Sequence, residues 1–146
     1  MPRRISRRRA PCSRSASPAS RQRGAPPRTC QDLERLDHAL RLNTEARGDA
    51  SRFERTDVGF HYVLATITGN PIFTAVHDAL VEWLTSQRTI ALSVAGVEAA
   101  ALAAHERIFE AVRQGDPNAA GEAMAGHLQE ISEIIQRASA CPATEQ

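Results

Sequence analysis

Apolar residues recur at a spacing of three to four through most of the chain after residue 29. In the first such stretch Leu33, Leu36 and Leu40 fall on one face, and the pattern stops at Gly48. This period is that of an amphipathic helix, and no alternating strand pattern competes with it. We expect five helices, over residues 30–47, 51–69, 71–91, 97–114 and 117–139. Because their connections are short, the predicted fold class is all-α, an antiparallel helical bundle.

Helix-boundary residues support these limits. Asn70-Pro71 and Asp116-Pro117 each place a capping residue before a proline, which favours the first turn of a helix. Ser51 and Glu54 have the spacing of a capping box, so we expect that helix to begin at Ser51. Residues 93–96 should break the chain between two helices.

The first 29 residues are rich in Arg, Ser, Pro and Ala and offer almost nothing to bury. Such a segment cannot offset its own ordering entropy, so we predict a disordered basic tail over 1–29. The helical domain should cover 30–139, and 140–146 should form a C-terminal tail. Residues 1–30 hold nine Arg and no acid, whereas 31–146 hold nine Arg against seventeen Asp and Glu. A nearly neutral chain therefore combines a basic tail with an acidic body.

The basic tail allows two interpretations. It could contact nucleic acid nonspecifically through phosphates, or it could be a solvated extension without a partner. No apolar run approaches the roughly 18 residues of a membrane span, so we expect a cytoplasmic protein with no membrane partner.

Four polar residues fall within the apolar stripes of three predicted helices. Asp57 and His61 share the inner face of the second helix, at a spacing that places them on adjacent turns. His105 lies at the centre of the stripe of the fourth helix, and His127 does so in the fifth. His38 lies opposite its stripe and should be solvated, while His77 lies at the flank of its helix face and should be partly buried.

Two interpretations of these inward residues remain open from the residues alone. Each histidine could be a core residue that is satisfied by a hydrogen bond, as most buried polar groups are. Alternatively, three neutral imidazoles and one carboxylate form a known ligand set for a divalent transition metal.

Several short motifs resemble one family. Asp57-Val-Gly-Phe-His61, Gly69-Asn70-Pro71, the stretch from His105 to Val112, Gly115-Asp116 and His127-Leu128 occur in the order found in the FCD domain. This is the C-terminal effector-binding domain of FadR-type GntR transcription regulators. The resemblance covers roughly residues 30–138.

The resemblance implies a helical bundle that holds a metal in its interior. By motif position the ligands would be Asp57, His61, His105 and His127, and the ion would be zinc, nickel or manganese. The ion would hold the carboxylate of a small organic acid, and Arg88 is the candidate for a second contact. A solvated charge near the end of its helix is the alternative for Arg88. The family also implies a homodimer that senses a small molecule and is not an enzyme.

The family normally carries a winged helix-turn-helix, a linker helix and a first domain helix before the matched part. Residues 1–29 occupy that place here, so sequence-specific DNA binding is unsupported by this sequence. Either the 5′ end of the gene is misread, or the chain is a free-standing effector domain. An incomplete bundle would expose apolar surface, so we expect reduced stability or self-association.

Two other functions are alternatives to this one. A metal-assisted hydrolase would need a general base, but Glu106 and Glu122 face away from the inner surfaces, and Glu98 has no supporting motif. A metal-free helical interaction domain would tolerate His105→Leu or His127→Leu without loss of stability.

Overall fold

Five helices make up the part of the chain that the computed structural model describes, which is residues 29–140 apart from the side chains at 85, 86 and 139. They are α1 (Cys30–Glu45), α2 (Ala50–Thr66), α3 (Pro71–Leu92), α4 (Val97–Gln114) and α5 (Pro117–Ala140). The predicted all-α bundle is confirmed, and each helix lies within a few residues of its expected limits. The predicted tails at 1–29 and 140–146 fall almost wholly outside the described residues.

Hydrogen bonds from side chains to the backbone mark the starts of the helices, and they correct one predicted start. The second helix, α2, is capped by Asp49, whose carboxylate accepts a hydrogen bond from the backbone N–H of Arg52. The capping box predicted at Ser51 is therefore wrong, because Ser51 already lies inside the helix and accepts from the Arg55 guanidinium. A complete capping box occurs instead at Thr29 and Asp32, at the start of α1.

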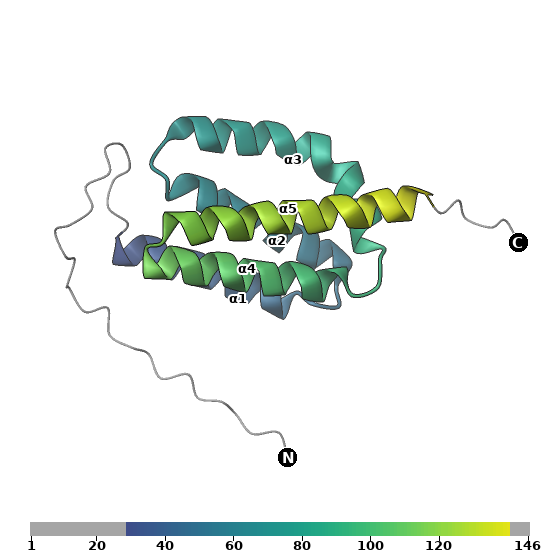
Figure 1. The fold of residues 1–146 in the computed structure, drawn as a ribbon, viewed down its shortest axis with the longest axis horizontal. Coiled ribbons are helices and arrows are strands. Elements are labelled where there is room, and N and C mark those ends of the chain that lie inside the picture. Colours follow the sequence, from purple (N-terminus) through teal and green to yellow (C-terminus); the bar gives the residue numbers. More distant parts are fainter. Residues whose placement is uncertain (1–28, 141–146) are drawn as a thin grey trace, which may run out of the picture.

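The turn between α4 and α5 shows why the connections stay short. Gly115 adopts a left-handed conformation (φ 77°), which residues with a Cβ rarely adopt. The carboxylate of Asp116 then accepts hydrogen bonds from the backbone N–H groups of Asn118 and Ala119. As a result α4 and α5 run antiparallel side by side (Figure 1).

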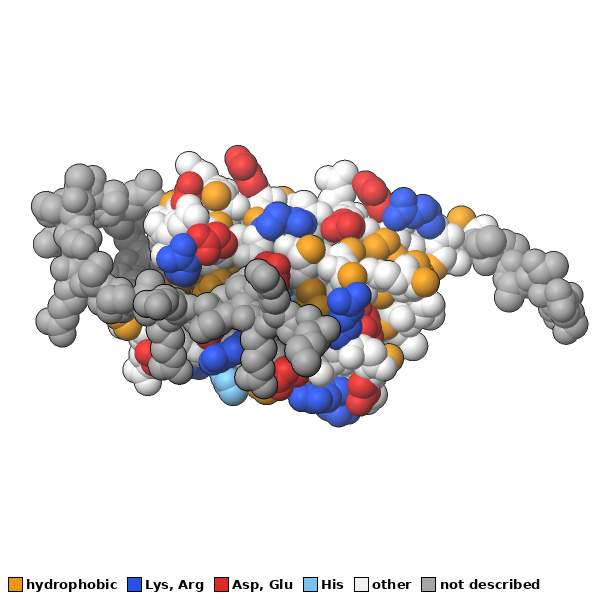
Figure 2. All heavy atoms as spheres, turned by 90° about the horizontal axis from the view of Figure 1, so that it is seen from below, with side chains coloured by type: hydrophobic (Ala, Val, Ile, Leu, Met, Phe, Trp, Pro, Cys, Tyr) orange, Lys and Arg blue, Asp and Glu red, His pale blue; other side chains and the backbone are white. Residues whose placement is uncertain are grey.

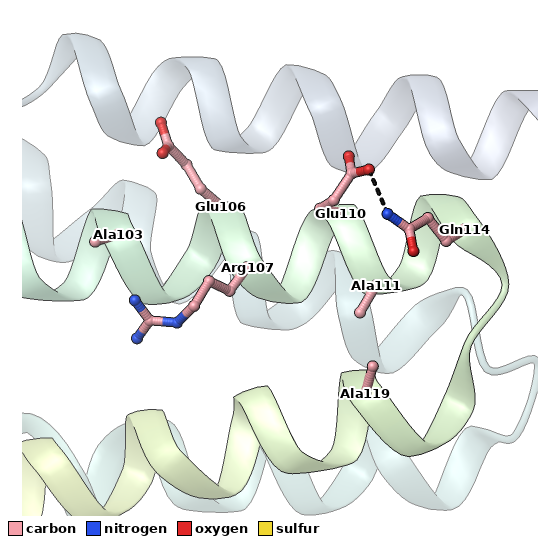
Figure 3. Close-up of a pocket in the computed structure, with 7 residues that line it drawn as sticks. All are labelled: Ala103, Glu106, Arg107, Glu110, Ala111, Gln114 and Ala119. Carbon is pink, nitrogen blue, oxygen red and sulfur yellow. Dashed lines mark hydrogen bonds between the residues drawn. The ribbon is translucent and has the colours of Figure 1, made fainter.

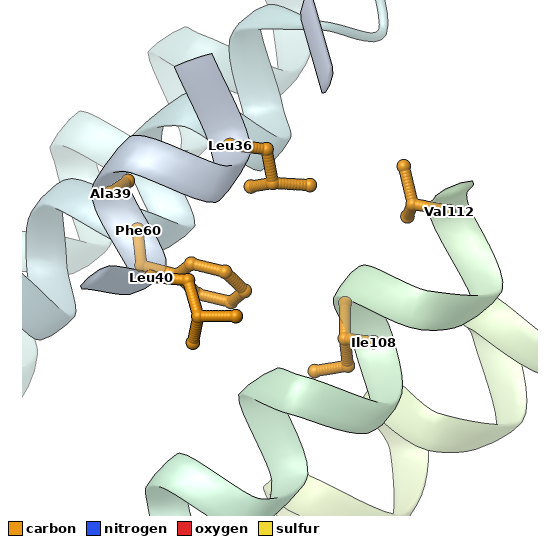
Figure 4. Close-up of a cluster of buried hydrophobic side chains, with 6 residues drawn as sticks. All are labelled: Leu36, Ala39, Leu40, Phe60, Ile108 and Val112. Atoms are coloured by element: carbon orange, nitrogen blue, oxygen red, sulfur yellow. The ribbon is translucent and has the colours of Figure 1, made fainter. Parts of the chain in front are cut away.

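The main core lies between α1, α2 and α4. Its buried members are Leu36, Ala39, Leu40, Phe60, Ile108 and Val112 (Figure 4). Smaller buried clusters lie near the other end of α4, around Phe53 and Val97. These contacts fix the α1–α2 pair against α4, which carries one of the inward histidines.

Helix α3 is packed differently. It lies on the outer side of the bundle and contacts mainly α2 and α5 (Figure 1). Among its described side chains only Ala91 is buried, and several large apolar ones are exposed: Ile72, Phe73, Val76, Leu80 and Trp83. The apolar side chains of α3 are therefore not packed into a closed core.

The described surface has mixed charge. On the face in Figure 2, acidic and basic side chains alternate with apolar ones over the residues that are described. Within the same part of the chain, no helix is long and apolar enough to cross a membrane.

Candidate metal centre and adjoining cavity

The three predicted inward histidines meet in the interior. His61 comes from α2, His105 from α4 and His127 from α5, and one ring nitrogen of each lies within 4.8 Å of the others. Their ring centroids are 4.9–5.4 Å apart. His105 and His127 are buried, at 0% and 4% exposure. The structure thus brings together side chains that are 66 residues apart in the sequence, from the position of His61 to that of His127.

Asp57 lies at the edge of this cluster. One carboxylate oxygen is 3.5 Å from Nε2 of His105, and the other is 3.9 Å from Nε of Arg88. Burial raises the pKa of Asp57 to about 6, and the opposing effects of His127 and Arg88 are smaller. The largely buried Asp57 carboxylate therefore lies next to the histidine cluster, in direct reach of one of its three members.

The histidines themselves are neutral near pH 7. Burial lowers the pKa of His61 to about 4, with further lowering by Arg88 and His77. Burial also lowers the pKa of His127 to about 4 and holds that of His105 far below its usual value. His105 and Asp57 therefore do not form an ion pair despite their distance. Neutral imidazoles offer lone pairs, which is the state that binds a metal.

Unpaired polar atoms mark the same place. Nε2 of His105 and Nδ1 of His127 are buried and have no hydrogen-bond partner. A buried polar atom without a partner costs about 1–3 kcal/mol, so two of them in one cluster call for a further group. The donor set and these orphaned atoms fit a divalent transition metal. The interpretation of the histidines as hydrogen-bonded core residues fits His105 Nδ1, but it leaves the other atoms unexplained.

A cavity of about 870 Å³ adjoins the cluster and is lined by residues of α2, α3, α4 and α5. Asp57, His61, His127 and Arg88 lie in its wall, and the rest of the lining is mostly apolar. Arg88 is mostly buried and donates a hydrogen bond to the backbone carbonyl of Val81, so it is not a solvated surface charge. A volume of this size is typical of sites for small molecules.

His77 also lines this cavity, which the sequence pattern did not indicate. Its Nδ1 pairs with the carboxylate of Asp78 at 3.1 Å, and its Nε2 is buried without a partner. In the sequence, the one indication is that His77 lies at the flank of the apolar face of its helix. In the structure, that flank borders the cavity. As predicted, His77 is partly buried and His38 is exposed.

A second depression lies on the outer surface of α4 and the start of α5 (Figure 3). Its lining combines alanines with Glu106, Arg107, Glu110 and Gln114, and Glu110 accepts hydrogen bonds from the Gln114 amide and the Arg113 guanidinium. These charges are satisfied or solvated, and the depression contains none of the inward histidines. The candidate chemistry therefore lies on the other side of α4.

Comparison with known proteins agrees with this geometry. The family model for the FCD domain matches residues 18–130, which is most of the chain. The chain belongs to the FCD-domain family. The resemblance inferred from the motifs around Asp57, His105 and His127 is thereby confirmed.

Curated relatives of this FCD domain are transcriptional repressors. The chain is 40% identical over 105 residues to the HTH-type transcriptional repressor NanR of Cronobacter sakazakii, covering 70% of this chain and 40% of that protein. It is 38% identical over 106 residues to the protein of the same name from Escherichia coli K12, covering 71% and 40%. The chain thus matches about two fifths of the length of these relatives.

Proposed function

We propose that this chain is a metal-dependent effector-binding domain of a GntR-type transcription regulator and that it senses a small organic acid. The observation that carries the proposal is the cluster of His61, His105 and His127, which adjoins a cavity that His61 and His127 line, with Asp57 beside it. The proposed role is regulatory rather than enzymatic, in line with the relatives named as repressors.

Asp57, His61, His105 and His127 would hold the ion, with zinc, nickel and manganese as the candidates. A bound divalent ion supplies a Lewis-acidic position to which a carboxylate can coordinate. Arg88 also lines the cavity, 3.9 Å from Asp57, and its guanidinium would pair with the carboxylate of the effector. The apolar remainder of the lining would surround the body of the acid and exclude water.

The arrangement of the helices supports a sensing mechanism. The cavity wall is drawn from both the well-packed helices and from α3, whose own packing is sparse. An acid that contacts Arg88 and His77 on α3 would favour the arrangement in which α3 closes on α2 and α5. In a complete, homodimeric regulator in the cytoplasm, this population shift would change the placement of the DNA-binding segments.

The hydrolase alternative needs a general base, and Glu98 does not supply one. Glu98 accepts a hydrogen bond from the backbone N–H of Gly48 at 2.8 Å, so it joins the start of α4 to the turn between α1 and α2. Glu106 and Glu122 are exposed, as expected.

The test is elemental analysis of the full chain, purified without chelator, as wild type and as the double variant His105→Ala/His127→Ala. We expect about one divalent ion per wild-type chain and none in the double variant. His38→Ala is the matched control, because His38 is exposed and far from the cluster in the sequence, and it should keep its metal. Small organic acids would then be screened by thermal shift on the metal-loaded wild type. A wild type that takes up no zinc, nickel or manganese would contradict the proposal.

A further inference from the structure

Asn43 is a polar residue that is completely buried, at 0% exposure, in the last turn of α1. Burial of an amide is costly unless its hydrogen-bonding groups are satisfied. Asn43 contacts two other helices: its side chain reaches the backbone and the Thr56 hydroxyl of α2, and it reaches the ring of His105 on α4. It therefore links the packed core to the histidine cluster.

The surroundings of Asn43 fix which way its amide points. Its Nδ2 donates to Oγ1 of Thr56 at 3.1 Å and to the carbonyl oxygen of Phe53 at 3.4 Å. The Thr56 hydroxyl hydrogen is directed to a carbonyl of its own helix, that of Arg52 or Phe53, so its oxygen is free to accept. A flipped amide would set its oxygen against the Phe53 carbonyl. Hence Oδ1 of Asn43 is the atom that faces His105.

The orientation of the amide then determines the tautomer of His105. Oδ1 of Asn43 lies 2.9 Å from Nδ1 of His105, and a carbonyl oxygen can only accept, so Nδ1 carries the hydrogen. A neutral imidazole has a single N–H, which leaves a lone pair on Nε2. That atom is buried without a hydrogen-bond partner and lies 3.5 Å from a carboxylate oxygen of Asp57. Two acceptors that face one another in this way are compatible with a cation between them.

We propose that Asn43 is a positioning residue of the metal centre, which holds His105 in the Nδ1–H tautomer and so keeps its Nε2 open for the ion. The inference rests on the proposed function in that it assigns a metal to the cluster, although the tautomer itself can be measured without any metal. Hydrogen bonds from a ligating histidine to an outer partner fix the orientation of the ring and the basicity of the ligand nitrogen.

The competing tautomer shows what Asn43 prevents. With the hydrogen on Nε2, His105 would donate to the carboxylate of Asp57, and both groups would then be engaged with each other. In that tautomer Nδ1 would present a lone pair to Oδ1 of Asn43 at 2.9 Å, which is repulsive. Asn43 therefore makes the unproductive pairing of His105 with Asp57 unfavourable.

The first measurement is the tautomer of His105 in the metal-free full chain, from long-range 1H–15N correlations of its imidazole at pH 7.5. We expect the Nδ1–H form in the wild type. Asn43→Leu removes the acceptor at similar size, and the Nε2–H form should then dominate. Asn43→Asp keeps an acceptor for Nδ1–H and should show the wild-type tautomer, with the Thr56 hydroxyl turned to donate to the oxygen that takes the place of Nδ2. Thr44→Val is the matched control: it removes a hydroxyl that bonds only within α1, to the Leu40 carbonyl, and should change nothing.

The second measurement is zinc affinity by competition with a chromophoric chelator. Asn43→Leu should weaken zinc binding by about 10- to 100-fold, and Asn43→Asp should bind within about threefold of the wild type or more tightly. An Nε2–H tautomer in the wild type would overturn the proposal, and so would an Asn43→Leu variant that binds zinc as tightly as wild type. If Asn43→Leu does not fold, the wild-type tautomer and the Asn43→Asp variant still decide. A wild type with the Nδ1–H form that binds no metal would instead defeat the proposed function.

Discussion

The two sides of this small bundle are built differently. Between α1, α2 and α4 the side chains are closed from solvent: Leu36 and Phe60 are 0% exposed and Ile108 is 1% exposed. On α3, by contrast, Phe73 is 54% exposed and Trp83 is 72% exposed, and the helix borders an open cavity. The histidine cluster lies where the two sides meet. The packed side can therefore hold the ligand atoms in place, while the open side leaves room for a molecule.

This difference also predicts where the molecule moves. A segment with few buried apolar contacts opens at a lower free-energy cost than the core does. Helix α3 carries both Arg88 and His77, which line the cavity, so a ligand that contacts them would bind the helix with the fewest buried side chains. The well-packed helices and the sparsely packed helix are thus separate parts of one domain.

The largest expected effect is the difference in stability between a truncation in the closed core and one on α3. Leu36→Ala should lower the free energy of unfolding by about 2–5 kcal/mol, because it leaves a cavity in the closed core. Leu80→Ala on α3 should cost less than about 1 kcal/mol, because Leu80 is already 41% exposed. Urea unfolding of both variants, followed by circular dichroism, makes the comparison. Equal losses would show that α3 is packed as tightly as the core.

Acidification of the metal-free protein should have the next largest effect. The lowered pKa values of His61, His105 and His127 stabilise the fold above about pH 6.5, and this contribution is lost as the pH falls toward 4, because the unfolded chain takes up the protons first. The raised pKa of Asp57 acts in the opposite direction between about pH 6 and 4. Three groups outweigh one by about two protons, so stability should fall by roughly 2–3 kcal/mol per pH unit below pH 6.

Urea unfolding between pH 7.5 and 5, in the presence of chelator, measures this dependence. Asp57→Asn removes the opposing contribution and should make the fall steeper. A free energy of unfolding that stays constant over this range would mean that the imidazoles take up protons in the folded state as readily as in the unfolded chain.

The packed side was largely predictable from the sequence, and the open side was not. The Leu33–Leu36–Leu40 stripe and the Pro and Gly residues at the helix ends are local signals, and the helices formed within a few residues of the expected limits. The inward positions of His61, His105 and His127 follow from helical period. Their convergence on one point depends on packing between helices that are distant in the sequence, and periodicity contains no information on it.

Asn43 and His77 show the limit more clearly. Asn43 carries no motif, and its role depends on a ring 62 residues away in the sequence. His77 belongs to an amphipathic helix whose apolar side would normally be filled; only the cavity makes it part of the site. The prediction of a capping box at Ser51 was wrong for a local reason: Asp49, two residues earlier, caps α2 instead.

The smallest effect compares the same substitution, histidine to leucine, in the packed core and on α3, in metal-free protein. His105→Leu should cost about 1–3 kcal/mol, because it leaves the buried Oδ1 of Asn43 without a donor. His77→Leu should change the free energy of unfolding by less than about 1 kcal/mol, because it removes an unpartnered buried nitrogen along with an exposed contact to Asp78. Thermal and urea unfolding of the two variants measure the difference. A large decrease in the free energy of unfolding on His77→Leu would show that this histidine supports the fold. No change would indicate that its polar ring serves the cavity and not the stability of the fold.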